Sequence, residues 1–116
     1  MSKFIHLHVH SEFSLLDGAV RFSDLVRQAK ESSMDTVAVT DHGVMYGCVE
    51  FYKQAKAAGV KPILGCEVYV APASRFDKTS KKDASNSHLT LLASNLVGYR
   101  NLMHLVSYAF LDGFYY

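Results

Sequence analysis

The residues of this sequence best suited to chemistry are histidines and acidic residues near the ends of apolar segments. Two histidines flank Val9, Asp17 follows in the next loop, an Asp-His pair follows the apolar run TVAVT, and two further candidates lie in or beside later apolar runs. Imidazole nitrogens and carboxylate oxygens are the ligands expected for zinc, manganese or iron. The candidates for a metal site are His8, His10, Asp17, Asp41, His42, Glu67 and His88.

His8 and His10 form the clearest pair. Histidines separated by one residue on a strand project in the same direction, about 7 Å apart, which suits one metal or a close metal pair. A bare pair is more often structural or exposed at the surface. The Asp-His pair and Glu67 favour metal binding, because burying so many ionisable groups together without a cation would be costly.

The apolar pattern predicts the elements that would position these groups. Alternation predicts a strand over 4–9 with a histidine face, and helical spacing predicts a helix after Ser23, which we expect to be its N-cap. The remaining elements are strands over 36–40, 62–71 and 88–93 and helices over 48–58 and 99–110. Gly59 should end the helix over 48–58.

This order is typical of right-handed βαβ units that build a parallel sheet, so the predicted fold class is α/β. The carboxyl ends of parallel strands meet at one edge, where α/β proteins place their sites. Four such strands form either an open sheet or about half of a closed barrel, and the pattern alone leaves both open.

Composition narrows the class of protein. A hydrophobic fraction of 49% supports a core, and a net charge of +1 excludes broad electrostatic capture of nucleic acid. Cys48 and Cys66 form neither a zinc knuckle nor a disulfide framework, and no signal peptide or membrane span is evident, which predicts a cytoplasmic protein without membrane contact. The segment 72–87 is an expected exposed loop whose basic residues are solvated or contact a partner. These are Arg75, Lys78, Lys81 and Lys82.

Three stretches resemble the successive opening motifs of the PHP (polymerase and histidinol phosphatase) domain of bacterial DNA polymerase III alpha subunits. They read HLHVHSEFSLLDGA, AVTDHGVMYGCVEFYKQAKAAGVKPILGCEVYVAP and HLTLLASNLVGYRNL. Histidinol phosphatases and family X polymerases mainly share the sparser histidine and acidic pattern. The resemblance covers nearly the whole chain and implies that 1–116 is a partial PHP domain, roughly the first half of a distorted (β/α)7 TIM-like barrel.

The resemblance also implies residue roles. His6 would be a buried supporting residue or a hydrogen-bond partner of a metal ligand, Asp41 would orient a ligand rather than bind metal, and His104 would pack or lie at the surface. A complete domain would hold two or three divalent ions of zinc, manganese or iron. The implied metal ligands are His8, His10, Asp17, His42, the bridging Glu67, and His88.

The implied parent is a DNA-directed DNA polymerase that acts in DNA replication, with DNA, a proofreading exonuclease subunit and other replisome subunits as partners. Some PHP domains of this family resemble 3′–5′ exonucleases, whereas others bind metal and serve structure and subunit contact. A free-standing PHP-type phosphatase is the third alternative. Because later ligands and the polymerase palm lie outside these 116 residues, we expect little or no catalysis from this piece alone.

Overall fold

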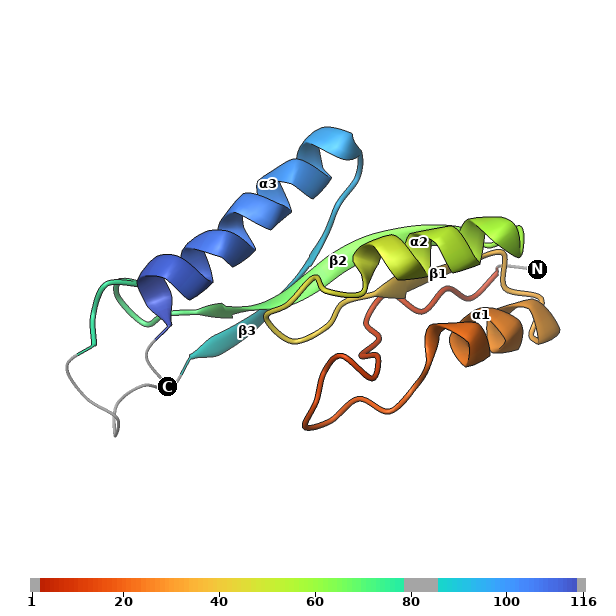
Figure 1. Cartoon of the computed structure of the whole chain (residues 1–116), viewed down its shortest axis with the longest axis horizontal. Coiled ribbons are helices and arrows are strands. Elements are labelled where there is room, and N and C mark those ends of the chain that lie inside the picture. Colours follow the sequence, from red (N-terminus) through yellow and green to blue (C-terminus); the bar gives the residue numbers. More distant parts are fainter. Residues whose placement is uncertain (1–2, 79–85, 115–116) are drawn as a thin grey trace.

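The structure is a computed structural model that describes residues 3–78 and 86–114. It is elongated, with principal extents of 48 × 28 × 27 Å. Figure 1 shows its elements in chain order: α1 (Phe22–Glu31), β1 (Thr36–Val39), α2 (Cys48–Ala57), β2 (Lys61–Val70), β3 (Ser87–Leu92), α3 (Leu96–Tyr108) and the π-helical turn η1 (Ala109–Gly113).

A βαβ unit forms the centre of the fold. β1 and β2 are parallel, with Thr36 opposite Lys61 and Val39 opposite Leu64, and α2 connects them. All four residues of β1 are buried, as expected for a short strand covered on both faces. Gly59 follows α2 with φ +74°, a conformation that favours glycine, so the predicted end of this helix is confirmed.

The last strand corrects the expectation of an all-parallel sheet. β3 pairs antiparallel with the second half of β2, which places Tyr69 opposite His88. A parallel return requires a long crossover, usually a helix, and the described residues between β2 and β3 form none. The sheet is therefore mixed, in the order β1-β2-β3.

The segment 4–9 is extended but is not a strand, so that expectation was wrong. It runs beside β1, where Ala38 N donates to His6 O at 3.0 Å and Thr40 N donates to Val9 O at 2.8 Å. The Val9 amide donates to the Thr40 hydroxyl at 3.1 Å instead of to a backbone carbonyl. The donors on β1 are two residues apart, whereas the accepting carbonyls of His6 and Val9 are three apart, so the even spacing of a regular parallel ladder is lost.

The core lies between α1, α2 and β1. Phe22 and Phe51 pack with ring centroids 5.4 Å apart and are almost completely buried. α1 begins at Phe22 after the N-cap Arg21, which makes no side-chain cap, so the expected cap at Ser23 was wrong. Apolar packing, rather than a cap, fixes the start of this helix.

α3 lies apart from α1 and α2, against the far part of β2 (Figure 1). Arg75 is not merely solvated, because its Nε donates to Asp112 Oδ2 at 3.1 Å and its guanidinium lies over the Tyr108 ring. Lys81 and Lys82 lie outside the described residues. Among the described helices, none has the length and apolarity needed to cross a bilayer.

Candidate metal centre

Glu67 is at the centre of a cluster of histidines. Its Oε2 lies 2.5 Å from Nε2 of both His8 and His10, and its Oε1 lies 2.8 Å from Nδ1 of His88. The Glu67 side chain is only 7% exposed, whereas those of His8 and His88 are about half exposed. The cluster thus has a buried carboxylate at its base and an opening toward solvent.

Asp17 and His42 extend this cluster on one side. His42 Nε2 lies 2.7 Å from Asp17 Oδ2, and the same oxygen is 3.5 Å from Nδ1 of His10. His10 therefore faces Glu67 with one ring nitrogen and Asp17 with the other. Among residues 3–78 and 86–114, three groups could each hold an ion, with ligand atoms within 4.8 Å of one another: His8, His10 and Glu67; His10, Asp17 and His42; and His42, Glu67 and His88.

The sheet positions most of these ligands. His42 follows β1 and forms a parallel bridge with Glu67 on β2, so the two side chains come from adjacent chain segments. Tyr69 is two residues beyond Glu67 and is paired with His88, which places all three on one face of the hairpin. The predicted meeting of the histidines and acids beyond β1 and along β2 is therefore seen, although His88 comes from an antiparallel strand.

The hydrogen-bonding requirements of the cluster fit a cation. Nδ1 of His42 is buried and has no hydrogen-bond partner in the described part of the chain, as a nitrogen awaiting a ligand would. His10 faces an acceptor at each ring nitrogen, which a neutral imidazole with a single N–H cannot satisfy. A divalent ion held here would take the lone pair of one ring nitrogen of each histidine, leave the other nitrogen as an N–H donor to a carboxylate, and balance the carboxylate charges.

The electrostatics of Glu67 agree with this arrangement. Burial alone raises the pKa of Glu67, but hydrogen bonds from His8, His10 and His88 outweigh burial and lower the pKa to about 2. Glu67 is thus ionised at neutral pH and available as a ligand. Burial raises the pKa of Cys66 to about 12, and its thiol donates to the Asp41 carbonyl at 3.3 Å, so this sulfur is not a ligand.

The Asp41 carboxylate accepts hydrogen bonds from the loop that contains Ser11 and Ser14 and belongs to none of the three candidate groups. It accepts from the Ser11 amide at 2.6 Å, the Ser11 hydroxyl at 2.8 Å and the Ser14 hydroxyl at 2.7 Å. It thereby anchors the loop that leads to Asp17. This geometry agrees with an orienting role and places no Asp41 oxygen among the candidate ligands.

The structure brings all six predicted ligands together and separates the other histidines from them. His6 is exposed and its ring meets Phe4 at 4.7 Å, so the expectation of a buried supporting residue was wrong. His104 is exposed on α3, consistent with a surface position. Sequence reasoning missed Tyr69, whose ring contacts His88 at 4.8 Å and His42 at 6.1 Å. Its position two residues after Glu67 was the available signal.

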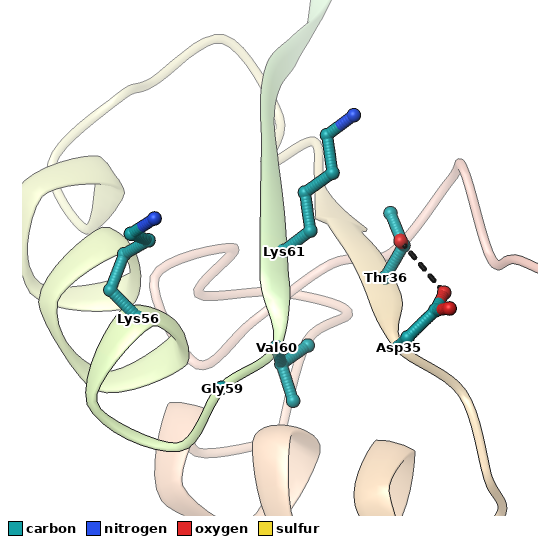
Figure 2. A pocket seen from close by; sticks show the side chains of 6 residues that line it. All are labelled: Asp35, Thr36, Lys56, Gly59, Val60 and Lys61. Atoms are coloured by element: carbon teal, nitrogen blue, oxygen red, sulfur yellow. Dashed lines mark hydrogen bonds between the residues drawn. The ribbon is translucent and has the colours of Figure 1, made fainter.

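A hollow of about 400 Å³ lies where β1 and β2 begin, at the ends of these strands that are remote from the cluster (Figure 2). Its lining includes Lys56, Lys61 and Asp35, and Asp35 accepts hydrogen bonds from Thr36 and from Lys3, at 3.0 and 2.6 Å. No histidine lines it. The chemistry-bearing residues therefore concentrate at the other edge of the sheet.

Comparisons with known proteins identify the family and the fold of this chain. The PHP domain family model matches residues 6–116. The chain is 53% identical over 116 residues to DNA polymerase III subunit alpha of Borreliella burgdorferi, covering 99% of this chain. It is 54% identical over 117 residues to DNA polymerase III subunit alpha of Thermus aquaticus, covering 97% of this chain. In both cases the match spans only 10% of the relative.

Two solved structures share the fold. An amidohydrolase from Chromobacterium violaceum, with bound sulfate and no metal, matches with a TM-score of 0.58 at 23% identity, over 86% of this chain and 32% of that one. A protein from Bifidobacterium adolescentis assigned as a metal-dependent phosphoesterase matches with a TM-score of 0.53 at 22% identity, over 86% and 31%. The α/β elements of this chain therefore correspond to part of a barrel fold.

The mixed sheet and the histidine and carboxylate cluster at its edge define an α/β domain whose side chains could hold metal ions. More particularly, the chain belongs to the PHP domain family, whose model matches almost its entire length.

Proposed function

We propose that this chain is the N-terminal part of the PHP domain of a DNA polymerase III alpha subunit, a cytoplasmic DNA-directed DNA polymerase that acts in DNA replication. Identity above 50% to two such subunits, over nearly all of the chain, carries this proposal. DNA, a proofreading exonuclease subunit and other replisome subunits would be the partners of the whole protein. Residues 1–116 would then supply part of a domain that further segments complete.

We further propose that the cluster belongs to a metal-dependent phosphoesterase site that removes nucleotides from DNA 3′ ends. Bound zinc, manganese or iron would supply Lewis-acid activation of water and neutralise charge on the attacked phosphate. The residues of this chain would hold the ions: Glu67 belongs to two of the candidate groups, and His10 faces Glu67 with one ring nitrogen and Asp17 with the other. His8 and His88, half exposed at the opening, would lie nearest the incoming phosphate.

The size of the natural product tests the polymerase proposal. An immunoblot of the source cells, with an antibody raised against this chain, should show a band many times larger than 12.9 kDa. A band at 12.9 kDa would contradict the assignment to a polymerase and would favour a short metal-binding protein.

Hydrolysis is tested in the full-length gene product with 3′-labelled DNA and Mn²⁺. We expect His10→Ala to abolish release of the label, because His10 belongs to two of the three candidate ion groups. His104→Ala is the matched control, since His104 is exposed on α3, and should retain activity. Metal binding by the wild type without release of label would support the structural, subunit-binding alternative. Equal release from the wild type and His10→Ala would contradict a nuclease role for this cluster.

A further inference from the structure

Ser14 joins two segments that carry candidate ligands. Its side chain lies in a buried position, with the residue only 3% exposed. Its hydroxyl donates to Asp41 Oδ1 at 2.7 Å and accepts from the His42 amide at 3.1 Å. One hydroxyl group therefore fixes the backbone of His42 relative to the loop that begins at Ser11.

The backbone of Ser14 holds Asp17 in the same way. The Ser14 carbonyl accepts hydrogen bonds from the Asp17 amide at 3.1 Å and from the Gly18 amide at 2.8 Å, which closes the turn. The Asp17 carboxylate at the end of this turn lies 2.7 Å from His42 Nε2. A shift of Ser14 would consequently move Asp17 and His42 relative to each other.

Asp41 makes this junction rigid. It is 3% exposed and accepts one hydrogen bond from Ser14 and two from Ser11, so its position is fixed by three short bonds. The loop also packs closely, because a β-carbon on Gly18 would lie only 1.9 Å from the Ser11 carbonyl oxygen. Little space remains in which the turn could rearrange without breaking these contacts.

We propose that Ser14 is a positioning residue for the metal centre, whose hydroxyl sets the spacing of Asp17 and His42 for an ion shared with His10. This inference rests on the proposed metal-binding function. It assigns no metal contact to Ser14 itself. It does make the group formed by His10, Asp17 and His42 depend on Ser14, whereas the group formed by His8, His10 and Glu67 has no hydrogen bond to Ser14.

The neighbouring Ser11 provides a matched control. Ser11 and Ser14 are both buried and each donates one side-chain hydrogen bond to Asp41, at 2.8 and 2.7 Å. Only the Ser14 hydroxyl also accepts from His42. Ser11→Ala and Ser14→Ala therefore remove a similar bond to Asp41, and only the second releases the His42 backbone.

The test is the binding of Mn²⁺ to the 116-residue chain, followed by the electron paramagnetic resonance signal of the free ion. Ser14→Ala should weaken Mn²⁺ binding about 10- to 100-fold, as loss of a residue that orients ligands does, while Ser11→Ala should stay within about threefold of wild type. Ser14→Thr retains the hydroxyl and should bind as wild type does. Circular dichroism verifies that each variant is folded before titration.

The outcomes separate this inference from the function on which it rests. Failure of the folded wild-type chain to bind Mn²⁺ would overturn the positioning role, whereas the nuclease proposal is decided separately by the assay of the full-length gene product. Binding by the wild type with equal effects of Ser11→Ala and Ser14→Ala would overturn only the positioning role. The same conclusion follows if Ser14→Ala unfolds while Ser11→Ala does not, because Ser14 would then serve stability, or if folded Ser14→Thr binds as weakly as Ser14→Ala.

Discussion

Glu67 combines burial with three histidine partners, and this combination gives the chain an acid-sensitive contribution to stability. Burial raises the pKa of its carboxyl, but the histidine hydrogen bonds outweigh burial and lower the pKa from 4.5 to about 2. Since the carboxyl is more acidic when folded, its ionised form stabilises the fold fully above about pH 4.5. That contribution is lost as the pH falls from about 4.5 to about 2.

The expected result is a pH-dependent difference between the wild type and Glu67→Gln in metal-free protein. Urea unfolding should show that the wild-type advantage in free energy shrinks between about pH 5 and pH 2, because the glutamine variant has no carboxyl to protonate. Glu50→Gln, at an exposed position on α2, is the control, and its free energy of unfolding should change with pH nearly as that of the wild type does. If the free energy of unfolding of Glu67→Gln also changes with pH as that of the wild type does, Glu67 makes no pH-dependent contribution to stability.

Tyr69 supports two candidate ligands through its ring rather than its hydroxyl. The ring meets His88 edge-on at 4.8 Å and stacks near His42 at 6.1 Å. Aromatic pairs contribute about 0.5–1.5 kcal/mol each, so Tyr69→Ala should weaken Mn²⁺ binding about 2- to 10-fold. Tyr69→Phe keeps the ring and should bind as the wild type does. Equal weakening in both variants would assign the effect to the hydroxyl instead.

At the scale of the elements, the βαβ unit was predictable because its signals are local. A buried β-branched run, an amphipathic helix ending at Gly59 and a second apolar run suffice to define β1, α2 and β2. The direction of β3 was not predictable from its own sequence, because pairing direction depends on the connection to β2. The segment 4–9 was predicted as a strand but pairs irregularly with β1, through contacts distant in sequence such as the bond from the Val9 amide to the Thr40 hydroxyl.

The candidate ligands of the site were predictable from the sequence, whereas the residues that contact and position them were not. Six candidate ligands carry recognisable types and spacing, and they converge. The contributions of Ser14 and Tyr69 come instead from contacts across the fold, with His42 in both cases. Serine in a loop and tyrosine in a strand are ordinary residues, so residue type alone did not mark them.

The contact of α1 with α2 depends on Gly47, the N-cap of α2. A β-carbon there would lie 2.4 Å from Phe22 Cζ and 2.8 Å from Phe13 Cδ2, so no larger residue fits without a shift of the core. Gly47→Ala should therefore reduce the free energy of unfolding by about 1–3 kcal/mol, as overpacked cores do. Urea denaturation of the chain measures this change.

Gly98 on α3 is the matched control for Gly47. Its nearest neighbour to an added β-carbon is at 3.6 Å, an ordinary contact distance, and alanine favours a helix over glycine by up to about 1 kcal/mol. Gly98→Ala should thus be neutral or slightly stabilising. Similar destabilisation by both substitutions would show that the packing at Gly47 is not the cause.

At the scale of the whole molecule, the cluster links segments far apart in the chain. His8 and His10 precede α1, His42 follows β1, Glu67 lies on β2 and His88 lies on β3. An ion held by these groups would bind the folded chain and not the unfolded one. Metal binding should therefore raise the stability of the whole fold.

We expect saturating Zn²⁺ or Mn²⁺ to raise the melting temperature of the chain and chelation to reverse the increase. At a free ion concentration 100 times the dissociation constant, the free energy of unfolding rises by about 2.7 kcal/mol per site. His42→Ala should lose much of it, because His42 belongs to two of the three candidate groups, while His104→Ala on α3 should keep it. An equal metal-induced rise in melting temperature in His42→Ala and in the wild type would place the stabilising ion elsewhere, because removal of the His42 ring would not weaken an ion bound outside this cluster.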